Sequence, residues 1–183
     1  SANPYLETAL WMVEGFAGGI SPWWHIVGGC HEDRRIYDLP VKQMHWHQQN
    51  EEFLYNRTCL ASVGILWSQS NVEFYGQDKA AERVEHAFRG ITLALNRAGI
   101  GYLPINADDL DAQGDKISVL VLPEMAALSE SQAQAIERFA ARGGSILAIG
   151  SIGVMDEHGD VRPSARLDDL MGIRTLDLGL DAI

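Results

Sequence analysis

Val63-Gly64-Ile65-Leu66-Trp67-Ser68 is an apolar stretch that ends in the polar residues Gln69-Ser70-Asn71 and precedes a long helical pattern. A short apolar run closed by polar residues is typical of a buried strand. The same cycle of strand, loop and helix recurs downstream, whereas the residues before about position 60 lack it. We therefore predict two parts, residues 1–58 and residues 59–183, and an α/β fold for the second part.

Three more strands are predicted after the first one. Residues 100–105 form one of them, and Pro104 favours the edge of a sheet because proline has no N–H for the ladder. Val119-Leu120-Val121-Leu122 is a continuous apolar run closed by Pro123, as expected of a strand buried on both faces. Residues 145–150 form the last strand. Strands that alternate with helices and short loops indicate a doubly wound parallel sheet.

Two long helices are predicted between these strands. After a polar loop at residues 69–77, Asp78 is expected to cap the first helix, which Gly99 ends. Ser129-Glu130-Ser131-Gln132 is a capping box that begins the second helix, and Gly143-Gly144 ends it.

Both ends of the chain depart from this alternation. Apolar residues at helical spacing predict a helix over residues 5–17, and a second helix is expected from Leu39 or Pro40 to Arg57. After the fourth strand, residues 153–163 have the pattern of a hairpin, and residues 167–171 that of a short helical turn. The first part of the chain is therefore expected to be mainly helical.

Composition and charge narrow the class of protein. Hydrophobic residues make up 46% and charged residues 21% of the 183 residues, as in ordinary globular proteins. The formal charge of -11 would repel both a phosphate backbone and an anionic membrane, so we expect neither nucleic acid nor a membrane as a partner. Cys30 and Cys59 lack metal or redox spacing, and we expect reduced, packed thiols in a cytoplasmic protein.

Candidate chemistry is sought beyond the carboxyl ends of the strands, where open parallel sheets bind ligands. No glycine-rich nucleotide motif follows the first strand, and we expect no cofactor. Ser151 partly resembles a nucleophile elbow, but a charged turn follows it rather than a helix, so a loop residue is the simpler interpretation. Glu124, after the third strand, is the other candidate. His45 and His47 point to opposite sides of a helix, so no metal site is expected there.

An aromatic and charged stretch before residue 36 is a second candidate site. Its rings can stack on sugars, and its polar groups can hydrogen-bond to hydroxyls. The residues in question are Trp23, Trp24, His25, Asp33 and Arg34. Packing at a helix–sheet junction is the simpler interpretation of paired tryptophans, and carbohydrate binding stays open beside it.

Several motifs together resemble one family. They are Val63–Ser68, Phe74-Tyr75-Gly76, Arg89-Gly90 with Leu93–Gly99, Val121-Leu122-Pro123, Leu128-Ser129, Gly143-Gly144, and Asp156-Glu157 with Gly159. Over roughly residues 60–175 the sequence resembles the glutamine-amidotransferase-like trimerisation domain of family-42-type β-galactosidases and related glycoside hydrolases. The resemblance implies a flavodoxin-like (class I glutamine-amidotransferase-like) fold for residues 59–183. Residues 1–58, with Pro22-Trp23-Trp24-His25 and Asp33-Arg34-Arg35, resemble the C-terminal end of the catalytic (β/α)8 barrel and its connector.

The resemblance implies an accessory function. Amidotransferases carry a nucleophilic Cys after the strand that corresponds to residues 145–149, where this chain has Gly150-Ser151, and no Cys follows Cys59. The paired carboxylates of a retaining glycosidase belong to earlier barrel strands. We therefore expect no catalytic residue in this chain. Its expected partners are further copies of itself, as a trimer with Phe74 and Tyr75 in an interface loop, and the rest of the parent hydrolase.

Two other functions remain open on the sequence. One is a small hydrolase on the same fold that uses Ser151 or Glu124. The other is a sugar-binding module that uses Trp23 and Trp24.

Overall fold

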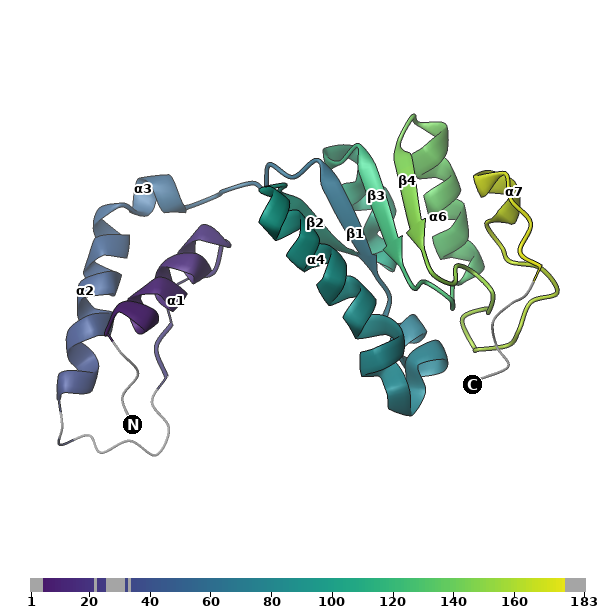
Figure 1. Ribbon diagram of the computed structural model, residues 1–183. Helices are drawn as coiled ribbons and strands as arrows, with labels where there is room; N and C mark the ends of the chain where they lie inside the picture. The colour runs from purple at the N-terminus through teal and green to yellow at the C-terminus, as the bar shows by residue number, and fades with distance from the viewer. Residues whose placement is uncertain (1–4, 22, 26–31, 33, 177–183) are drawn as a thin grey trace. The chain divides into compact units, whose positions relative to one another are not determined.

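The computed structural model describes residues 5–21, 23–25, 32 and 34–176. The chain divides into an N-terminal unit, Ser1–Thr58, and a C-terminal unit, Cys59–Ile183 (Figure 1). No helix in these described ranges has the length and apolarity needed to cross a membrane.

The described residues of the N-terminal unit form three helices: α1 (Tyr5–Ala17), α2 (Arg35–Gln49) and the single turn α3 (Glu51–Leu54). The prediction for α1 is confirmed. The predicted bounds of the second helix are wrong, because α2 begins before Pro40 and ends well before Arg57. Asn50 ends α2 by turning its side-chain amide back to the carbonyl of Trp46, at 2.8 Å. Polar capping at Asn50 therefore divides what the sequence pattern presents as one helix.

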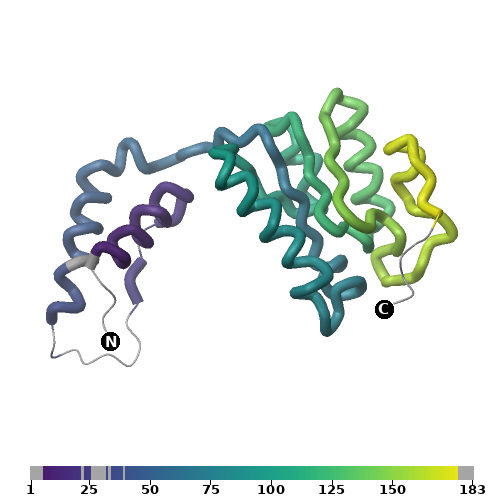
Figure 2. Tube along the Cα trace, in the orientation of Figure 1, coloured from purple at the N-terminus to yellow at the C-terminus, as the bar shows by residue number. Residues whose placement is uncertain are grey.

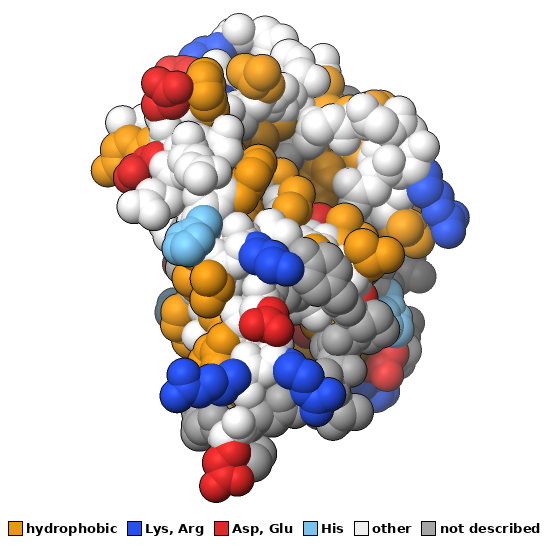
Figure 3. All heavy atoms as spheres, turned by 90° about the vertical axis from the view of Figure 1, so that its left-hand side faces the viewer, with side chains coloured by type: hydrophobic (Ala, Val, Ile, Leu, Met, Phe, Trp, Pro, Cys, Tyr) orange, Lys and Arg blue, Asp and Glu red, His pale blue; other side chains and the backbone are white. Residues whose placement is uncertain are grey.

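Helix α1 is apolar on two faces. One face packs on α2, where the ring of Phe16 lies 4.9 Å from that of His47, and it buries Met12 as well as Phe16. The other face carries Leu6, Leu10 and Val13, which are 78%, 56% and 42% exposed. Figure 3 shows apolar side chains at the surface beside charged ones on the face turned to the viewer. The apolar stripe that predicts this helix is thus exposed and not covered by the described residues of the N-terminal unit.

The C-terminal unit contains one parallel sheet in the order β2-β1-β3-β4. Its strands are β1 (Val63–Trp67), β2 (Tyr102–Asn106), β3 (Val119–Pro123) and β4 (Ser145–Ile149). All four predicted strands are confirmed within two residues. Pro104 lies on an edge strand, as predicted, and β3 is central and largely buried. The α/β class is therefore confirmed.

Helices lie on both faces of the sheet (Figure 1). Helix α4 (His86–Ala98) covers one face, and α5 (Leu110–Gln113) and α6 (Glu130–Ala141) pack on the other. The main core forms on the α6 side, where Leu66, Leu120 and Leu122 of the strands meet Ile136 and Phe139. The other side is less completely covered, since Leu147 of β4 is 50% exposed.

The helix ends follow the predicted chemistry at three of four positions. Ser129 and Gln132 form the capping box of α6, each side chain bonded to the other's backbone N–H. Gly143 follows α6 with a φ of 93°, and Gly99 ends α4 with a φ of 68°. Asp78 is the exception, because it lies inside the short 3-10 helix η2 (Gln77–Lys79) and caps no helix.

The polar segment after β1 is helical, so the predicted loop at residues 69–77 is wrong. It forms the π-helix η1 (Asn71–Gly76). After η2, a second π-helical segment, η3 (Ala81–Glu85), leads into α4. Asn71 is completely buried, while Glu73 and Phe74 face outwards. The polarity that predicted a loop therefore belongs partly to the outer face of a helix and partly to a buried amide.

After β4 the chain returns along the side of the unit, as the tube in Figure 2 shows, and ends in α7 (Asp168–Met171). The predicted hairpin is confirmed by an antiparallel bridge between Met155 and Val161. Arg166 ties this segment to α6 through Glu130, at 2.7 and 2.8 Å, and Glu137, at 2.6 Å. Three charge-assisted hydrogen bonds thus hold the return segment in place.

The thiols differ from the prediction where the structure describes them. Cys59 is exposed, with its Sγ 3.9 Å from the carbonyl oxygen of Tyr102. It is not packed, because it lies on the connection into β1 rather than within the strand. Cys30 lies outside the described residues.

Gly64 lets β1 pack against the core, and this gives a matched test. A Cβ at Gly64 would overlap the Cδ1 atoms of Ile117 and Ile105, whereas one at Gly90 in α4 meets nothing within 4 Å. Gly64→Ala should lower the free energy of unfolding by about 1–3 kcal/mol because it overpacks the core. Gly90→Ala should raise it by about 0.5–1 kcal/mol because alanine is the better helix former. Urea denaturation followed by circular dichroism measures both, and equal effects would contradict this packing.

The Arg166 network predicts a dependence of stability on pH. Hydrogen bonds from Arg166 lower the pKa of Glu130 from 4.5 to about 2. Because the folded pKa lies below the unfolded one, the contribution is fully present above pH 4.5 and is lost as the pH falls towards 2. The stability difference between wild type and Arg166→Gln should therefore shrink over that range, while a Lys79→Gln control shows no such change. Urea denaturation at a series of pH values measures the difference, and one that is constant with pH would refute the assignment.

Candidate functional site

The candidate site lies where β1 and β3 end, because the strand order reverses between these two neighbours. The chain leaves β1 towards β2 on one side, and β3 continues towards β4 on the other. The side chains near this point come from the segments after β1, β3 and β4. They are Ser68, Asn71, Tyr75, Glu124 and Ser151.

Asn71 occupies the space between the two strand ends. Its amide nitrogen donates to the carbonyl oxygen of Glu124, at 2.7 Å, and its amide oxygen accepts from the N–H of Ala127, at 2.9 Å. The Ser68 hydroxyl accepts a weaker bond from the Asn71 backbone N–H, at 3.4 Å. Asn71 is completely buried, and its side chain joins the two segments at the edge of the sheet where open parallel sheets commonly bind ligands.

Glu124 has an unusual backbone. Its φ of 48° lies in the left-handed region, which is rare for a residue with a side chain. In this conformation its N–H donates to the carbonyl oxygen of Ile149, at 2.8 Å, and its carboxylate accepts from the N–H of Ser151, at 3.1 Å. The carboxylate occupies the position that a Cβ of Gly150 would take. Glu124 therefore joins the ends of β3 and β4 and requires glycine at position 150.

Tyr75 completes the cluster from the other side. Burial, together with the carboxylate of Glu124, raises the pKa of its phenol, while a hydrogen bond with the Ser151 side chain and the charge of Arg83 act in the opposite direction. Arg83 lies 6.0 Å from the centre of the Tyr75 ring and donates to the Tyr75 carbonyl, at 3.1 Å. The phenol, the carboxylate and the serine hydroxyl are thus close together.

This arrangement bears on Ser151 and Glu124 as candidate catalytic groups. The structure brings them together, but the Glu124 carboxylate is engaged by the backbone of Ser151. No helix begins directly after Ser151, in contrast to a nucleophile elbow. The ring of His158, the next histidine along the chain, lies 6.4 Å from Phe74. The contact between Glu124 and Ser151 joins the segments that follow β3 and β4.

The predicted interface residues lie on different sides of η1. Phe74 is 37% exposed and packs edge-on against His158. Tyr75 points inwards and packs on a small cluster that includes Ala126 and Met155. Of the pair, Phe74 is the residue that a partner can reach.

The aromatic stretch of the N-terminal unit is only partly brought together. Trp23 and Trp24 line a hollow of about 260 Å³ with Trp11, and the ring of His25 lies 5.1 Å from that of Trp23. The indole N–H of Trp24 is buried without a hydrogen-bond partner in the described part of the chain. Arg34 is the exposed residue before α2 and does not line this hollow. Asp33 lies outside the described residues.

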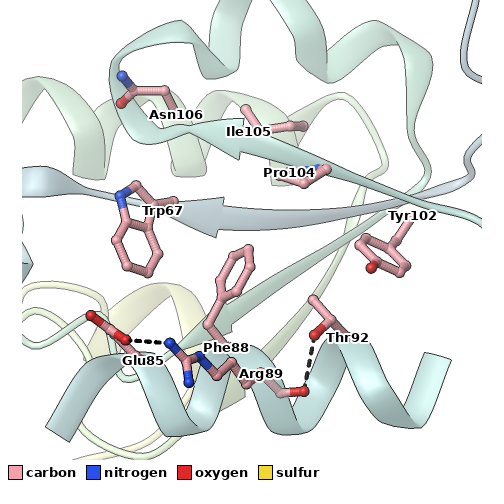
Figure 4. Close-up of a pocket in the computed structure, with 9 residues that line it drawn as sticks. All are labelled: Trp67, Glu85, Phe88, Arg89, Thr92, Tyr102, Pro104, Ile105 and Asn106. Carbon is pink, nitrogen blue, oxygen red and sulfur yellow. Dashed lines mark hydrogen bonds and ion pairs between the residues drawn. The ribbon is translucent and has the colours of Figure 1, made fainter. Parts of the chain in front are cut away.

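A hollow that sequence reasoning missed lies between α4 and the strands β1 and β2 (Figure 4). It measures about 580 Å³. Its lining residues are Trp67, Glu85, Phe88, Arg89, Thr92, Tyr102, Pro104, Ile105 and Asn106. The sequence features that could have indicated this hollow are a tryptophan at the carboxyl end of a strand and a phenylalanine in the next helix. Among the described residues, no three His, Cys, Asp or Glu side chains group closely enough to hold a metal ion.

Comparison with known proteins rests on the fold. No family model and no curated protein matches the sequence. A β-galactosidase from Bacillus circulans sp. alkalophilus matches with a TM-score of 0.68 and 22% identity over 80% of this chain. A β-galactosidase from Rahnella sp. R3 matches with a TM-score of 0.66 and 18% identity over 93% of it. An α-L-fucosidase (isoenzyme 2) from Paenibacillus thiaminolyticus matches with a TM-score of 0.52 and 21% identity over 83%.

These matches are to parts of longer proteins. The chain spans 22% of the Bacillus enzyme, 28% of the Rahnella enzyme and 22% of the fucosidase. A match to 93% of this chain necessarily includes residues of both its units. The chain therefore shares the fold of a segment found in β-galactosidases.

Asn71 predicts a large local effect. Asn71→Ala would leave the carbonyl of Glu124 and the N–H of Ala127 buried without partners, and it should lower the free energy of unfolding by about 2–4 kcal/mol. Gln69→Ala is the matched control, since Gln69 is exposed and bonds only Glu73, and it should cost less than about 0.5 kcal/mol. Urea denaturation measures both. Two similar small effects would show that Asn71 does not bridge the strand ends.

Proposed function

We propose that this chain is a non-catalytic oligomerisation and accessory part of a glycoside hydrolase of β-galactosidase type. Residues 59–183 would be its flavodoxin-like, amidotransferase-like domain, and residues 1–58 the C-terminal remnant of a catalytic barrel. The observation that carries the proposal is the pair of hydrogen bonds by which Asn71 joins the segments after β1 and β3. We propose that this side chain takes the place of a ligand at the strand ends, so that the domain acts through its surface.

The strand order supports the proposed fold relationship. A flavodoxin-like sheet has the strand order 2-1-3-4-5. The order β2-β1-β3-β4 of this sheet agrees with the first four strands of that order. The matching segments make up 22% of the Bacillus β-galactosidase and 28% of the Rahnella enzyme. An accessory part of a larger hydrolase fits both observations.

Helix α1 supports the proposal that residues 1–58 belong to a larger body. Burial of Met12 and Phe16 on one face and exposure of Leu6, Leu10 and Val13 on the other make it apolar nearly all round. Such a helix is stable in water only when another part of the protein covers its second face. The missing cover is proposed to be the remainder of the barrel, which would also bring the catalytic carboxylates.

Self-association is proposed to use the surface around Phe74. With a formal charge of -11, copies of this chain repel one another, so assembly needs an apolar contact that outweighs the repulsion. Phe74 is an exposed aromatic residue on the rigid η1 helix and is backed by His158. Aromatic side chains are enriched at the centres of such interfaces. A trimer in the cytoplasm is the proposed assembly.

Light scattering coupled to size exclusion tests the proposed assembly. The 183-residue chain should show the mass of a trimer, and Phe74→Glu should shift it to the monomer because a carboxylate would be buried in the contact. Leu93→Glu is the matched control, since Leu93 is also exposed but lies on α4. It should leave the mass unchanged. A wild-type chain that is monomeric at every concentration tested would overturn the proposed oligomerisation.

A further inference from the structure

The hollow between α4 and the edge of the sheet is separate from the closed crevice. Trp67 ends β1 and Asn106 ends β2, so both lie at the carboxyl edge of the sheet. Glu85, Phe88 and Arg89 face them from the segment that leads into and begins α4. The hollow thus runs from the carboxyl ends of β1 and β2 along the face of the sheet to Tyr102, the first residue of β2.

Three aromatic rings form the apolar part of the hollow. The rings of Trp67 and Phe88 meet edge to face, with centroids 5.2 Å apart and planes at 82°. Figure 4 shows these rings, with Tyr102 farther along, between the strands and α4. All three side chains are only partly buried, so part of each ring faces the hollow. Aromatic faces of this kind pack against the C–H groups of a sugar ring.

Polar groups surround the rings. Arg89 pairs with Glu85, at 2.9 Å, and the guanidinium keeps other N–H donors because it has five. The hydroxyl of Tyr102 can donate and accept. Closely spaced donors and acceptors of this kind match neighbouring hydroxyls on one ring.

Size and charge restrict the ligand. About 580 Å³ falls within the range of small-molecule pockets, whereas a protein partner would need a far larger contact area. The charges of Glu85 and Arg89 cancel, and the chain as a whole is strongly acidic. A neutral ligand is therefore favoured over an anion.

We infer that this hollow binds a neutral pyranose sugar, with its C–H face on Trp67 and its hydroxyls at Arg89 and Tyr102. The choice of a sugar among neutral ligands rests on the proposed function, since an accessory domain of a glycoside hydrolase works among saccharides. The site is one for binding and does not catalyse a reaction. It would hold a substrate or product near the enzyme at a position independent of the barrel.

Titration of the 183-residue chain tests this site. The probes are methyl β-galactoside and lactose, with glucuronate as the charged counterpart. Isothermal titration calorimetry and saturation-transfer NMR measure their binding. The neutral sugars should bind, and glucuronate should bind more weakly. Arg89→Ala should weaken binding about tenfold because a charged hydrogen bond is lost, and Arg97→Ala, on the same helix but outside the hollow, should not.

A third variant separates the two aromatic sites. Trp23→Ala should leave sugar binding unchanged if the hollow at Trp67 is the site. Loss of binding in Trp23→Ala but not in Arg89→Ala would overturn the inference and assign the sugar to the N-terminal unit. Absence of binding by any neutral sugar would also overturn it. Because the titration does not depend on the oligomeric state, a monomeric chain that binds sugar would refute the proposed assembly and leave this site standing.

Discussion

The arrangement of the strand ends in the C-terminal unit depends on the two hydrogen bonds of the Asn71 side chain. They join the segment after β1 to the segment after β3, across the point where an open parallel sheet normally receives its ligand. The π-helix η1 begins at Asn71 and places Phe74 at the surface and Tyr75 inside. These bonds hold the ends of β1 and β3 together.

The strands and the long helices of this unit were predictable because their signals are local. The apolar run at residues 119–122 shows burial on both faces, and the capping box at Ser129 fixes the start of α6 by its own hydrogen bonds. The segment after β1 was not predictable in the same way. Its polar residues indicate a loop until it is known that Asn71 finds partners 53 and 56 residues further along. Tertiary contacts supply the hydrogen bonds that local sequence cannot show.

The sequence predicted where the candidate site lies, but not which contacts its residues make. The positions after β1, β3 and β4 follow from the topology alone, and Glu124 and Ser151 do lie together there. The left-handed backbone of Glu124 and the shared contact with Tyr75 depend on how three segments meet, which no spacing reveals. The hollow at Trp67 was missed for a related reason. Its residues come from β1, β2 and α4, and they become neighbours only after the sheet has formed.

We propose that the chain itself closes the crevice between β1 and β3, so that the C-terminal unit acts through its surface. Native-state hydrogen exchange of the Ala127 amide, which donates to Asn71, tests this most directly. If the crevice stays closed, this amide exchanges only when the whole unit unfolds, with the same free energy as the amides of the central strand β3. Exchange through a low-energy local opening, at a much lower free energy than that of β3, would contradict the account.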